Sequence, residues 1–517
     1  MAIKAKPNQV ALAVLLLFLV CGIFWISTQH ADYKTVAVGQ FIAKPYLQLG
    51  SKGGLAIVWQ IAGTPAAKAQ TTGQTAGPIS APNEGQWQFE TMQEGKWTPG
   101  PPISRRLLSI DSIEPIELNW VDVTKFGIKA FDYRLLKNGT VVFTAHADER
   151  AESSTHYKYA VMGDCGADSV AQRKVAYQLH IAKPNFILIT GDIVYPDGRA
   201  SEYIHHFFPI YNNENTSPSE GAPLMRSILM AAVPGNHDIG KAALFDVRNM
   251  AVFPDSLAYF YEWLQPLNGP GVFGKPNTPI LLHNSERQQR FRVAAGENYP
   301  AMSTFFFDLG NARFLMLDAD HYMDWSNKVW RKWLDDALAG AKDKKWRFVL
   351  YHQTAFNSDQ SHFSEQRMRA ISDILEKNDV RIVFCGHVHN YQRTFPLHFK
   401  PNAMDARGMV GGEMELASKG TPTHAGEIVY ITTGGGGGPL TGTQISMTPQ
   451  KWQPFTEKFI ARTHSFSLVD VNGDNLTFKQ ISEDGVELDK FTLSAAPYSV
   501  PAKMATPGPA KGHASVK

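Results

Sequence analysis

Cysteine is scarce in this sequence, and neither sign of charge dominates it. The 517 residues include three cysteines, 50 Lys and Arg, and 48 Asp and Glu, for a formal net charge of +2. Three cysteines provide no visible disulfide framework, and without a basic run there is no reason to expect a nucleic-acid partner. Hydrophobic residues make up 44% and charged residues 19%, a globular composition that excludes a disordered or fibrous chain. The length predicts more than one core.

Near the N-terminus lies a long apolar run, at residues 10–26, preceded by Lys4 and Lys6. The run predicts that residues 1–32 are a signal peptide or an N-terminal membrane anchor. No good small-x-small cleavage site follows, which slightly favours the anchor. The lysines are then expected inside and the rest of the chain outside the cytoplasm, secreted or membrane-anchored. A buried core helix explains the basic flank less well.

Residues 33–150 have the pattern of an all-β module. Short alternating or β-branched runs such as LAIVWQI and VVFTAHA are separated by Gly, Pro, Ser and Asn, and no helical period intervenes. The Lys-Asn-Gly between FDYRLL and TVVFTA is a strong hairpin signal. These features predict a small β-sandwich.

From residue 153 the pattern changes to alternating strands and helices. Apolar runs such as YKYAVM, FILIT and RFVLY are separated by helical segments, which predicts an α/β core with strands buried on both faces. Residues 241–300 look like a large irregular insertion. Strands return at 427–495, and the Pro/Ala/Lys-rich tail at 496–517 is expected to be disordered.

Several polar residues stand where the apolar runs of this core end. They are Asp164 in GDCG, Asp192 and Tyr195 in GDIVY, Asn236 and His237 in GNHD, His352 in VLYH, and His387 and His389 in GHVH. Sites in open α/β sheets form beyond the carboxyl ends of the strands, so these side chains are expected to converge. They are too many for one metal ion, whereas two metals sharing a bridging carboxylate would use them all.

The donor types divide this inventory into two sets. Asp164, Asp192 and Tyr195 offer hard oxygen donors, and because a free phenol has a pKa of about 10, binding as phenolate requires a strong Lewis acid. This set suits a trivalent ion such as Fe(III), with Asp192 as the natural bridge. The second set is softer and suits Zn(II), Mn(II) or Fe(II). It comprises Asn236, His352 and His387.

The five blocks resemble, in the same order, those of the purple acid phosphatases, a branch of the calcineurin-like metallophosphoesterases. The tyrosine of GDIVY distinguishes this branch from the wider superfamily. KPYLQLG and LAIVWQ resemble the fibronectin-III-like domain of plant-type members, and SFSLVDVNGDNLTFKQI resembles their C-terminal segment. The resemblance implies a fibronectin-III-like sandwich at 33–150. It also implies a metallophosphoesterase domain at 153–495, an α/β sandwich of two mixed sheets flanked by helices, with 427–495 as its C-terminal β segment.

The resemblance also implies a role for each polar residue. Fe(III) would be held by Asp164, Asp192, Tyr195 and His389. The divalent metal would be held by Asp192, Asn236, His352 and His387. His237 would contact the phosphate and donate a proton to the leaving oxygen, and His362 lies where the family has another phosphate-contacting histidine. Members often have two adjacent histidines there, but Ser361 precedes His362 in this chain, which leaves the leaving-group acid open.

The expected function is that of an acid phosphatase which hydrolyses small phosphate monoesters, with a metal-bound hydroxide as nucleophile. One alternative is a phosphodiesterase that acts on nucleotides or lipid head groups. Another, from a different class, is a non-catalytic cell-surface binding protein whose β module binds the partner. The complete ligand set argues against the latter.

Other polar and small residues have simpler interpretations. Cys165 and Cys385 are expected to pack beneath the site rather than bind a metal, because thiolate mismatches a hard ferric pocket. The glycine run 434–438 is expected to be a tight backbone turn near the site, since no helix with a lysine follows it. The remaining histidines without a motif are expected to be structural or exposed. They are His205, His206, His398, His424 and His464.

Overall fold

A computed structural model of the protein describes most of the chain between residues 41 and 495. The described ranges are 41–63, 87–109, 114–126, 129–151, 154–240, 247–270, 278–282, 285–405, 407–417 and 426–495. The expected signal or anchor at 1–32 and the expected tail at 496–517 lie outside these ranges. Within them, no helix combines the length and the apolar character needed to cross a bilayer.

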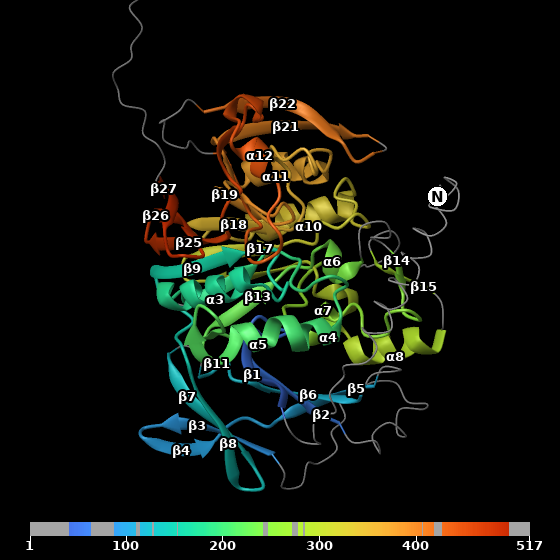
Figure 1. Ribbon diagram of the computed structural model, residues 1–517, viewed down its shortest axis with the longest axis vertical. Coiled ribbons are helices and arrows are strands. Elements are labelled where there is room, and N and C mark those ends of the chain that lie inside the picture. Colours follow the sequence, from blue (N-terminus) through green and yellow to red (C-terminus); the bar gives the residue numbers. More distant parts are fainter. Residues whose placement is uncertain are drawn as a thin grey trace, which may run out of the picture.

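Two mixed sheets form the framework of the molecule (Figure 1). The ten-stranded sheet has the order β27 (Glu487–Ser494), β26 (Asn475–Ser482), β25 (Ser465–Asn472), β9 (His156–Met162), β10 (Phe186–Ile189), β13 (Leu229–Ala232), β1 (Phe41–Leu49), β2 (Leu55–Ala62), β6 (Ile116–Asp122) and β5 (Ser104–Leu108). The seven-stranded sheet has the order β16 (Phe305–Leu309), β17 (Ala312–Met316), β18 (Trp346–Tyr351), β19 (Ile382–Cys385), β23 (Val429–Thr433), β20 (Tyr391–Thr394) and β24 (Thr456–Ile460).

Aromatic side chains fill the space between the two sheets. The ring of Tyr159 on β9 lies 5.3 Å from that of Phe348 on β18, and Phe186 on β10 lies 5.3 Å from Phe314 on β17. Side chains alternate along each strand, so the neighbouring residues of β10 and β18 point outwards into a second apolar cluster. Burial on both faces explains why these strands are nearly continuous apolar runs.

Helices cover the outer faces of both sheets (Figure 1). The helix α3 (Val170–Ala182) lies on the ten-stranded sheet, whereas α10 (Lys328–Ala339) and α11 (Ser372–Lys377) lie on the seven-stranded sheet. The other α-helices of the described residues are α4 (Ala200–Glu202), α5 (Phe208–Tyr211), α6 (Asn236–Ile239), α7 (Tyr259–Glu262), α8 (Ser285–Ala295), α9 (Asn298–Ala301) and α12 (Thr443–Ser446). Three strand pairs lie outside the main sheets: β11 (Asn212–Ser217) with β12 (Gly221–Pro223), β14 (Val247–Asn249) with β15 (Ile280–Leu282), and β21 (Leu397–Met404) with β22 (Val410–Leu416). The predicted α/β fold of two mixed sheets flanked by helices is confirmed.

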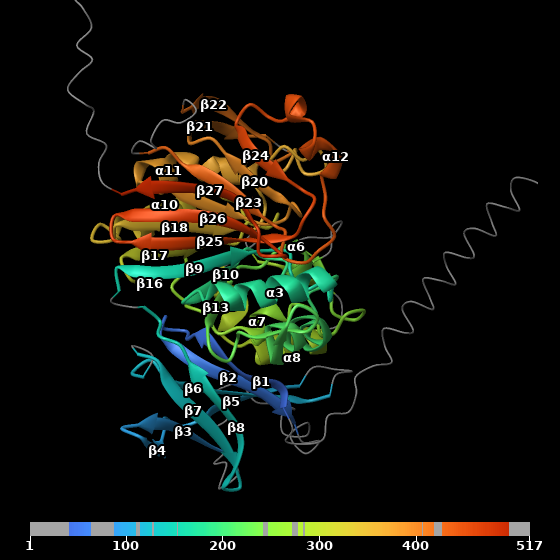
Figure 2. The ribbon, with the colours of Figure 1, turned by 60° about the vertical axis from the view of Figure 1, so that its left-hand side comes forward.

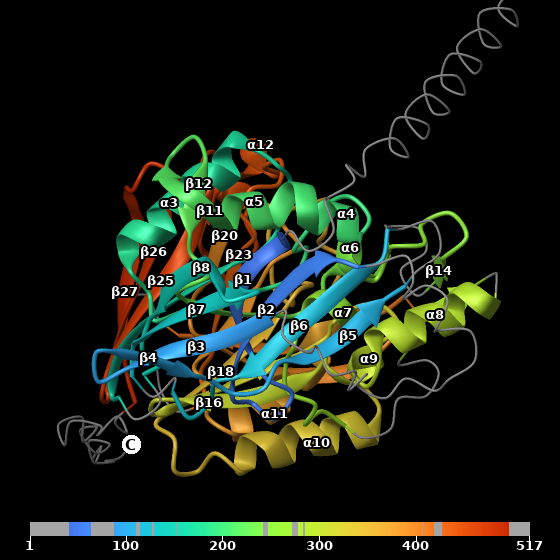
Figure 3. The same ribbon diagram turned by 90° about the horizontal axis from the view of Figure 1, so that it is seen from below.

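The N-terminal module is all-β in its described residues, as predicted, and lies at one end of the molecule (Figures 2 and 3). Its second sheet has the order β4 (Lys96–Pro99), β3 (Trp87–Gln93), β7 (Phe131–Lys137) and β8 (Thr140–Ala147). The predicted hairpin joins β7 to β8, where Asn138 and Gly139 have φ values of 50° and 76°. The first sheet of the module continues into the core, because β1 pairs parallel with β13 through Gln48 and Met230.

The predicted insertion at 241–300 is less irregular than its sequence indicates. It contains α8, whose polar sequence SERQQRFRVAA buries only Phe291, Ala294 and Ala295. The guanidinium of Arg106 on β5 donates to the carbonyls of Ala294 (3.2 Å) and Ala295 (2.9 Å) at the end of this helix. A helix with so narrow an apolar face gives little periodic signal, which explains why the sequence does not reveal it.

Candidate metal centre

Five parallel strands bring the polar motifs to one edge of the sandwich. In the ten-stranded sheet, β9, β10 and β13 are parallel neighbours, and β18 and β19 are parallel neighbours in the other sheet. The loop after each strand carries one motif. Since the carboxyl ends of parallel strands meet at a common edge, residues far apart in the sequence become neighbours there.

One half of the site combines two carboxylates, a phenol and an imidazole. Ligand atoms of Asp164, Asp192 and His389 all lie within 4.8 Å of one another. The hydroxyl of Tyr195 lies 3.2 Å from Oδ1 of Asp164 and 3.0 Å from Nε2 of His389. Nδ1 of His389 donates to the carbonyl of Pro439 at 2.8 Å, so Nε2 presents its lone pair to this cluster.

The other half is built from neutral donors around His352. Its Nε2 lies 3.1 Å from Oδ1 of Asn236, 3.2 Å from Nδ1 of His387 and 3.3 Å from Oδ1 of Asp192. Its Nδ1 donates to the carbonyl of Thr190 at 2.8 Å. When His352 and His387 are neutral, the lone pair on Nε2 of His352 faces the lone pairs of Asn236 and His387 at about hydrogen-bond distance. Only a proton or a cation between these atoms stabilises such an arrangement.

Asp192 lies between the two halves and contacts both. Its Oδ1 also accepts the backbone N–H of His237 at 2.8 Å, which fixes the carboxylate in place. The donor set therefore fits two metal ions that share Asp192. All seven predicted ligands converge at this edge, and their assignment to two metals stays a prediction.

Three of the converging residues have a backbone that is unfavourable for a side chain. Asp164, Asp192 and His387 have φ values of 57°, 47° and 68°, in the left-handed region. The side chain of Asp164 holds the loop that carries His387, because the N–H of His387 donates to both carboxylate oxygens, at 3.1 and 2.9 Å. Strain of this kind is typical of functional sites.

The two histidines expected to contact phosphate lie next to different ligands of the centre. His237 donates from Nδ1 to the carbonyl of Pro196 at 2.7 Å, its ring lies 4.6 Å from that of Tyr195, and its Nε2 is 3.9 Å from Oδ2 of Asp192. The ring of His362 lies 4.3 Å from that of His387. Each half of the site therefore has one flanking histidine.

Comparison with known proteins agrees with this geometry. Residues 157–391, which span all five motifs, match the family of calcineurin-like phosphoesterases. This part of the chain is a calcineurin-like phosphoesterase domain.

The relatives of this chain are named for different activities. A nucleotide pyrophosphatase/phosphodiesterase of Hordeum vulgare is 28% identical over 213 residues, covering 38% of this chain and 52% of the relative. A probable inactive purple acid phosphatase of Arabidopsis thaliana is 24% identical over 326 residues, covering 61% of this chain and 44% of the relative. The matches thus span about half of the relatives' own length. A purple acid phosphatase from yellow lupin (Lupinus luteus) seeds has the same fold, with a TM-score of 0.54 and 16% identity over 87% of this chain and 74% of that one.

Burial and the neighbouring charges set the ionisation of the candidate metal centre. Burial raises the pKa of Asp192, but the adjacent His352 and His237 outweigh it and hold that pKa below its ordinary value. Burial lowers the pKa of His352, yet Asp192 raises it to about 10, so a proton on His352 stabilises the metal-free centre. For Tyr195, burial and then Asp164 and Asp192 raise the pKa well above 10. Only a strong Lewis acid would ionise a phenol in these surroundings.

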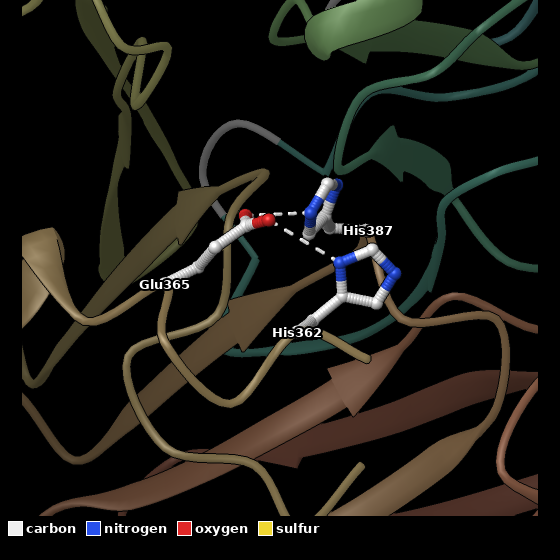
Figure 4. A group of neighbouring side chains, drawn as sticks. All are labelled: His362, Glu365 and His387. Carbon is white, nitrogen blue, oxygen red and sulfur yellow. Dashed lines mark hydrogen bonds and ion pairs between the residues drawn. The ribbon is translucent and has the colours of Figure 1, made fainter. Parts of the chain in front are cut away.

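The structure adds Glu365, which the sequence does not reveal, to the residues of the centre (Figure 4). Its carboxylate lies between His362 and His387, and the three residues offer ligand atoms within 4.8 Å of one another. Burial raises the pKa of Glu365, but its contacts with His362 and His387 lower it well below its usual range. Glu365 stands three residues after His362 in the loop after β18, too far from the end of that strand to be marked as a strand-end residue.

The glycine run 434–438 packs directly against the backbone of the motif loops. A Cβ on Gly434 would lie 2.3 Å from the carbonyl oxygen of Val388, and one on Gly436 would lie 2.4 Å from that of Gly163. The N–H of Gly438 donates to the carbonyl of Asp164 at 2.8 Å. The run is therefore a tight turn close to the site, as predicted, because no larger residue fits there.

The cysteines and the described histidines outside the motifs agree with their expected roles. Cys165 and Cys385 are buried in the apolar cluster beneath the motif loops and are unpaired. His206 contacts the carbonyl of Tyr195 at 3.1 Å, and His464 contacts that of Gly438 at 2.9 Å, so both support loop backbone. His424 lies outside the described residues.

Proposed function

We propose that this protein is a dinuclear phosphatase of the purple acid phosphatase type that hydrolyses small phosphate monoesters. The observation that carries the proposal is the position of Tyr195, whose phenol lies within hydrogen-bond distance of Asp164 and His389. An anionic pocket with a phenol suits Fe(III), and the neutral pocket around His352 suits a divalent ion such as Zn, Mn or Fe. When bound, the two cations would neutralise the phosphate charge and lower the pKa of a water molecule.

The chain's own residues supply orientation and proton donation. His237 has its Nδ1 bonded to a backbone carbonyl, so its Nε2 is the nitrogen that would donate to a phosphate oxygen or to the leaving oxygen. His362 has its Nδ1 turned to Glu365 at 3.3 Å, so its Nε2 is available. Ser361 stands where members of the family often have the second histidine, and its hydroxyl donates to Asp359 at 2.7 Å. His237 is therefore the stronger candidate for the leaving-group acid.

Two other functions remain as candidates. The barley relative named a nucleotide pyrophosphatase/phosphodiesterase favours activity on diesters or pyrophosphates. The Arabidopsis relative named probable inactive favours a non-catalytic role. The complete donor set in this chain supports a catalytic function over a binding role. Export from the cytoplasm is part of the proposal and rests on the apolar N-terminal sequence alone.

The visible spectrum tests the proposal most directly. We expect the purified protein to contain iron and a divalent metal, to absorb visible light through the Tyr195 phenolate, and to hydrolyse p-nitrophenyl phosphate faster than bis-p-nitrophenyl phosphate. Tyr195→Phe should abolish the absorption band, whereas Tyr203→Phe, which removes a buried phenol bonded to Trp263, should keep it. A Tyr195→Phe protein that stays coloured would rule out Tyr195 as a ligand. Faster turnover of the diester would favour the phosphodiesterase.

A further inference from the structure

One carboxylate links the divalent half of the site to the flanking histidine. Oε2 of Glu365 lies 2.6 Å from Nε2 of His387, and Oε1 lies 3.3 Å from Nδ1 of His362 (Figure 4). Glu365 comes from the loop after β18 and His387 from the loop after β19, so the contact also joins two loops. The side chain of Glu365 is 21% exposed, which leaves little room for water to replace these contacts.

The contact with Glu365 determines which nitrogen of His387 faces the metal centre. Oε2 of Glu365 and Nε2 of His387 approach to 2.6 Å as an ion pair, although the alignment of the two groups is not that of a hydrogen bond. Because a carboxylate offers only acceptors, so close an approach is favourable only when Nε2 carries the proton. The lone pair of a neutral His387 is then on Nδ1, the atom that lies 3.2 Å from Nε2 of His352. Carboxylate partners of this kind fix the tautomer and the ring orientation of metal-binding histidines.

The same reasoning applies to His362. Its Nδ1 faces Oε1 of Glu365, and its Nε2 has no partner among the described residues. The rings of His362 and His387 are inclined by 65°, so the carboxylate holds the two rings edge to face. The atom of His362 that remains for a phosphate oxygen is therefore Nε2, on the side of the ring away from Glu365.

We propose that Glu365 is a positioning residue that orients His387 for the divalent metal and His362 for the phosphate at the same time. This inference rests on the proposed function, because it needs both a divalent metal and a phosphate ester. The ferric half of the site shares no contact with Glu365. Its loss should therefore weaken the divalent half selectively and leave the ferric half intact.

Metal affinity of the full-length protein tests the proposal without relying on turnover. In Glu365→Ala we expect the dissociation constant of the divalent metal to rise about 10- to 100-fold, with iron content and the visible band unchanged. Glu365→Gln keeps an oxygen acceptor for Nε2 of His387 and should recover most of that affinity. His362→Ala should leave the divalent metal affinity unchanged. Glu376→Ala, which breaks a similar 3.3 Å carboxylate–imidazole contact with His398 outside the site, should do the same.

A second measurement reads the tautomer in the metal-free protein. With 15N-labelled histidine, the His387 signals should report a proton on Nε2 in the wild-type protein and a mixture of tautomers in Glu365→Ala. Equal divalent affinity in wild type and Glu365→Ala, or loss of iron and divalent metal together without recovery in Glu365→Gln, would overturn the positioning role. Failure of the proposed function would give another result, because the wild-type protein itself would then bind no pair of metals. The tautomer measurement would still decide the role of Glu365.

Discussion

Two buried carboxyl groups in this protein have opposite surroundings. Asp192, at the metal centre, accepts an N–H from His237 at 2.8 Å and lies 3.3 Å from Nε2 of His352. Glu262, at the junction between the N-terminal strands and the core, accepts a hydrogen bond from Gln60 on one oxygen and has no partner among the described residues for the other. The pKa of Asp192 is held below its usual value by the histidines despite burial, whereas burial raises the pKa of Glu262 to about 8.

The comparison shows that burial alone does not make a carboxyl group functional. The surroundings of Asp192 stabilise its charge, so it can act as a ligand as soon as a cation arrives. The surroundings of Glu262 favour the neutral acid. This form fits a structural role at the junction between the N-terminal strands and the core. The backbone carbonyl of Glu262 supports this second role, because it accepts hydrogen bonds from Tyr46 (3.0 Å) and Gln48 (2.9 Å) on β1.

The largest effect is expected for Asp192→Asn, which removes the charge shared by both halves of the site. Both metals should be lost, and phosphatase activity should fall to the background rate, because the metal-bound nucleophile is lost with them. Metal analysis and phosphatase kinetics check this. Asp489→Asn is the matched control, since Asp489 is a buried carboxylate that accepts from Arg393 and Tyr391 away from the site. It should lower stability and retain both metals. Full metal content in Asp192→Asn would contradict the bridging assignment.

A smaller effect on activity is expected for His237→Ala, which removes the imidazole next to Asp192 and leaves the Asp192 carboxylate in place. The backbone N–H that fixes Asp192 stays in place, so both metals and the visible band should be retained. The turnover number should fall by about 10²- to 10⁴-fold, because general-acid assistance to the leaving oxygen is lost. The loss should be smaller for p-nitrophenyl phosphate, whose leaving group needs little protonation, than for an alkyl phosphate. Equal losses for both substrates would assign the proton donor elsewhere.

The difference between the two regions also explains what could be predicted from the sequence. Asp192 and its partners follow apolar strands, and the meeting of parallel strand ends at one edge is a general property of such sheets. Their convergence was therefore predictable from sequence order alone. Glu262 stands in YEWL, a segment without strand or turn signals, and its burial depends on the pairing of β1 with β13, about 180 residues apart in the chain. Nothing local reveals that pairing.

Glu365 belongs to the unpredictable residues for a related reason. Its importance comes from two contacts, one local with His362 and one with His387 on another loop. Only the second contact makes it part of the centre, and it is fixed by how the loops after β18 and β19 fold over the site. Residues that contact the ligands of a metal rather than the metal itself are generally brought into place by tertiary packing. The order of sequence motifs therefore predicts the ligands better than it predicts the residues that orient them.

The smallest effect on activity is expected for Glu262→Gln, which should change only the pH dependence of stability. The folded protein keeps a proton on Glu262 up to about pH 8, whereas the unfolded chain releases it near an ordinary pKa of about 4.3. The folded state thus binds more protons between these values, and stability falls as pH rises through this window, by up to about 1.4 kcal/mol per pH unit. The amide of Glu262→Gln does not titrate, so its free energy of unfolding should decline less between about pH 5 and about pH 8.

Urea unfolding across this pH window, with kcat/KM measured in parallel, checks the prediction. Glu214→Gln is the control, because hydrogen bonding to Arg226 lowers the pKa of Glu214 to about 2 and its contribution changes only below the window. Wild type and Glu214→Gln should therefore share one slope, and Glu262→Gln should be flatter while its kinetics match wild type. A common slope for all three would mean that Glu262 is ionised in the folded protein. The contrast with Asp192 would then fail, and the junction would have to stabilise a buried charge through groups other than Gln60.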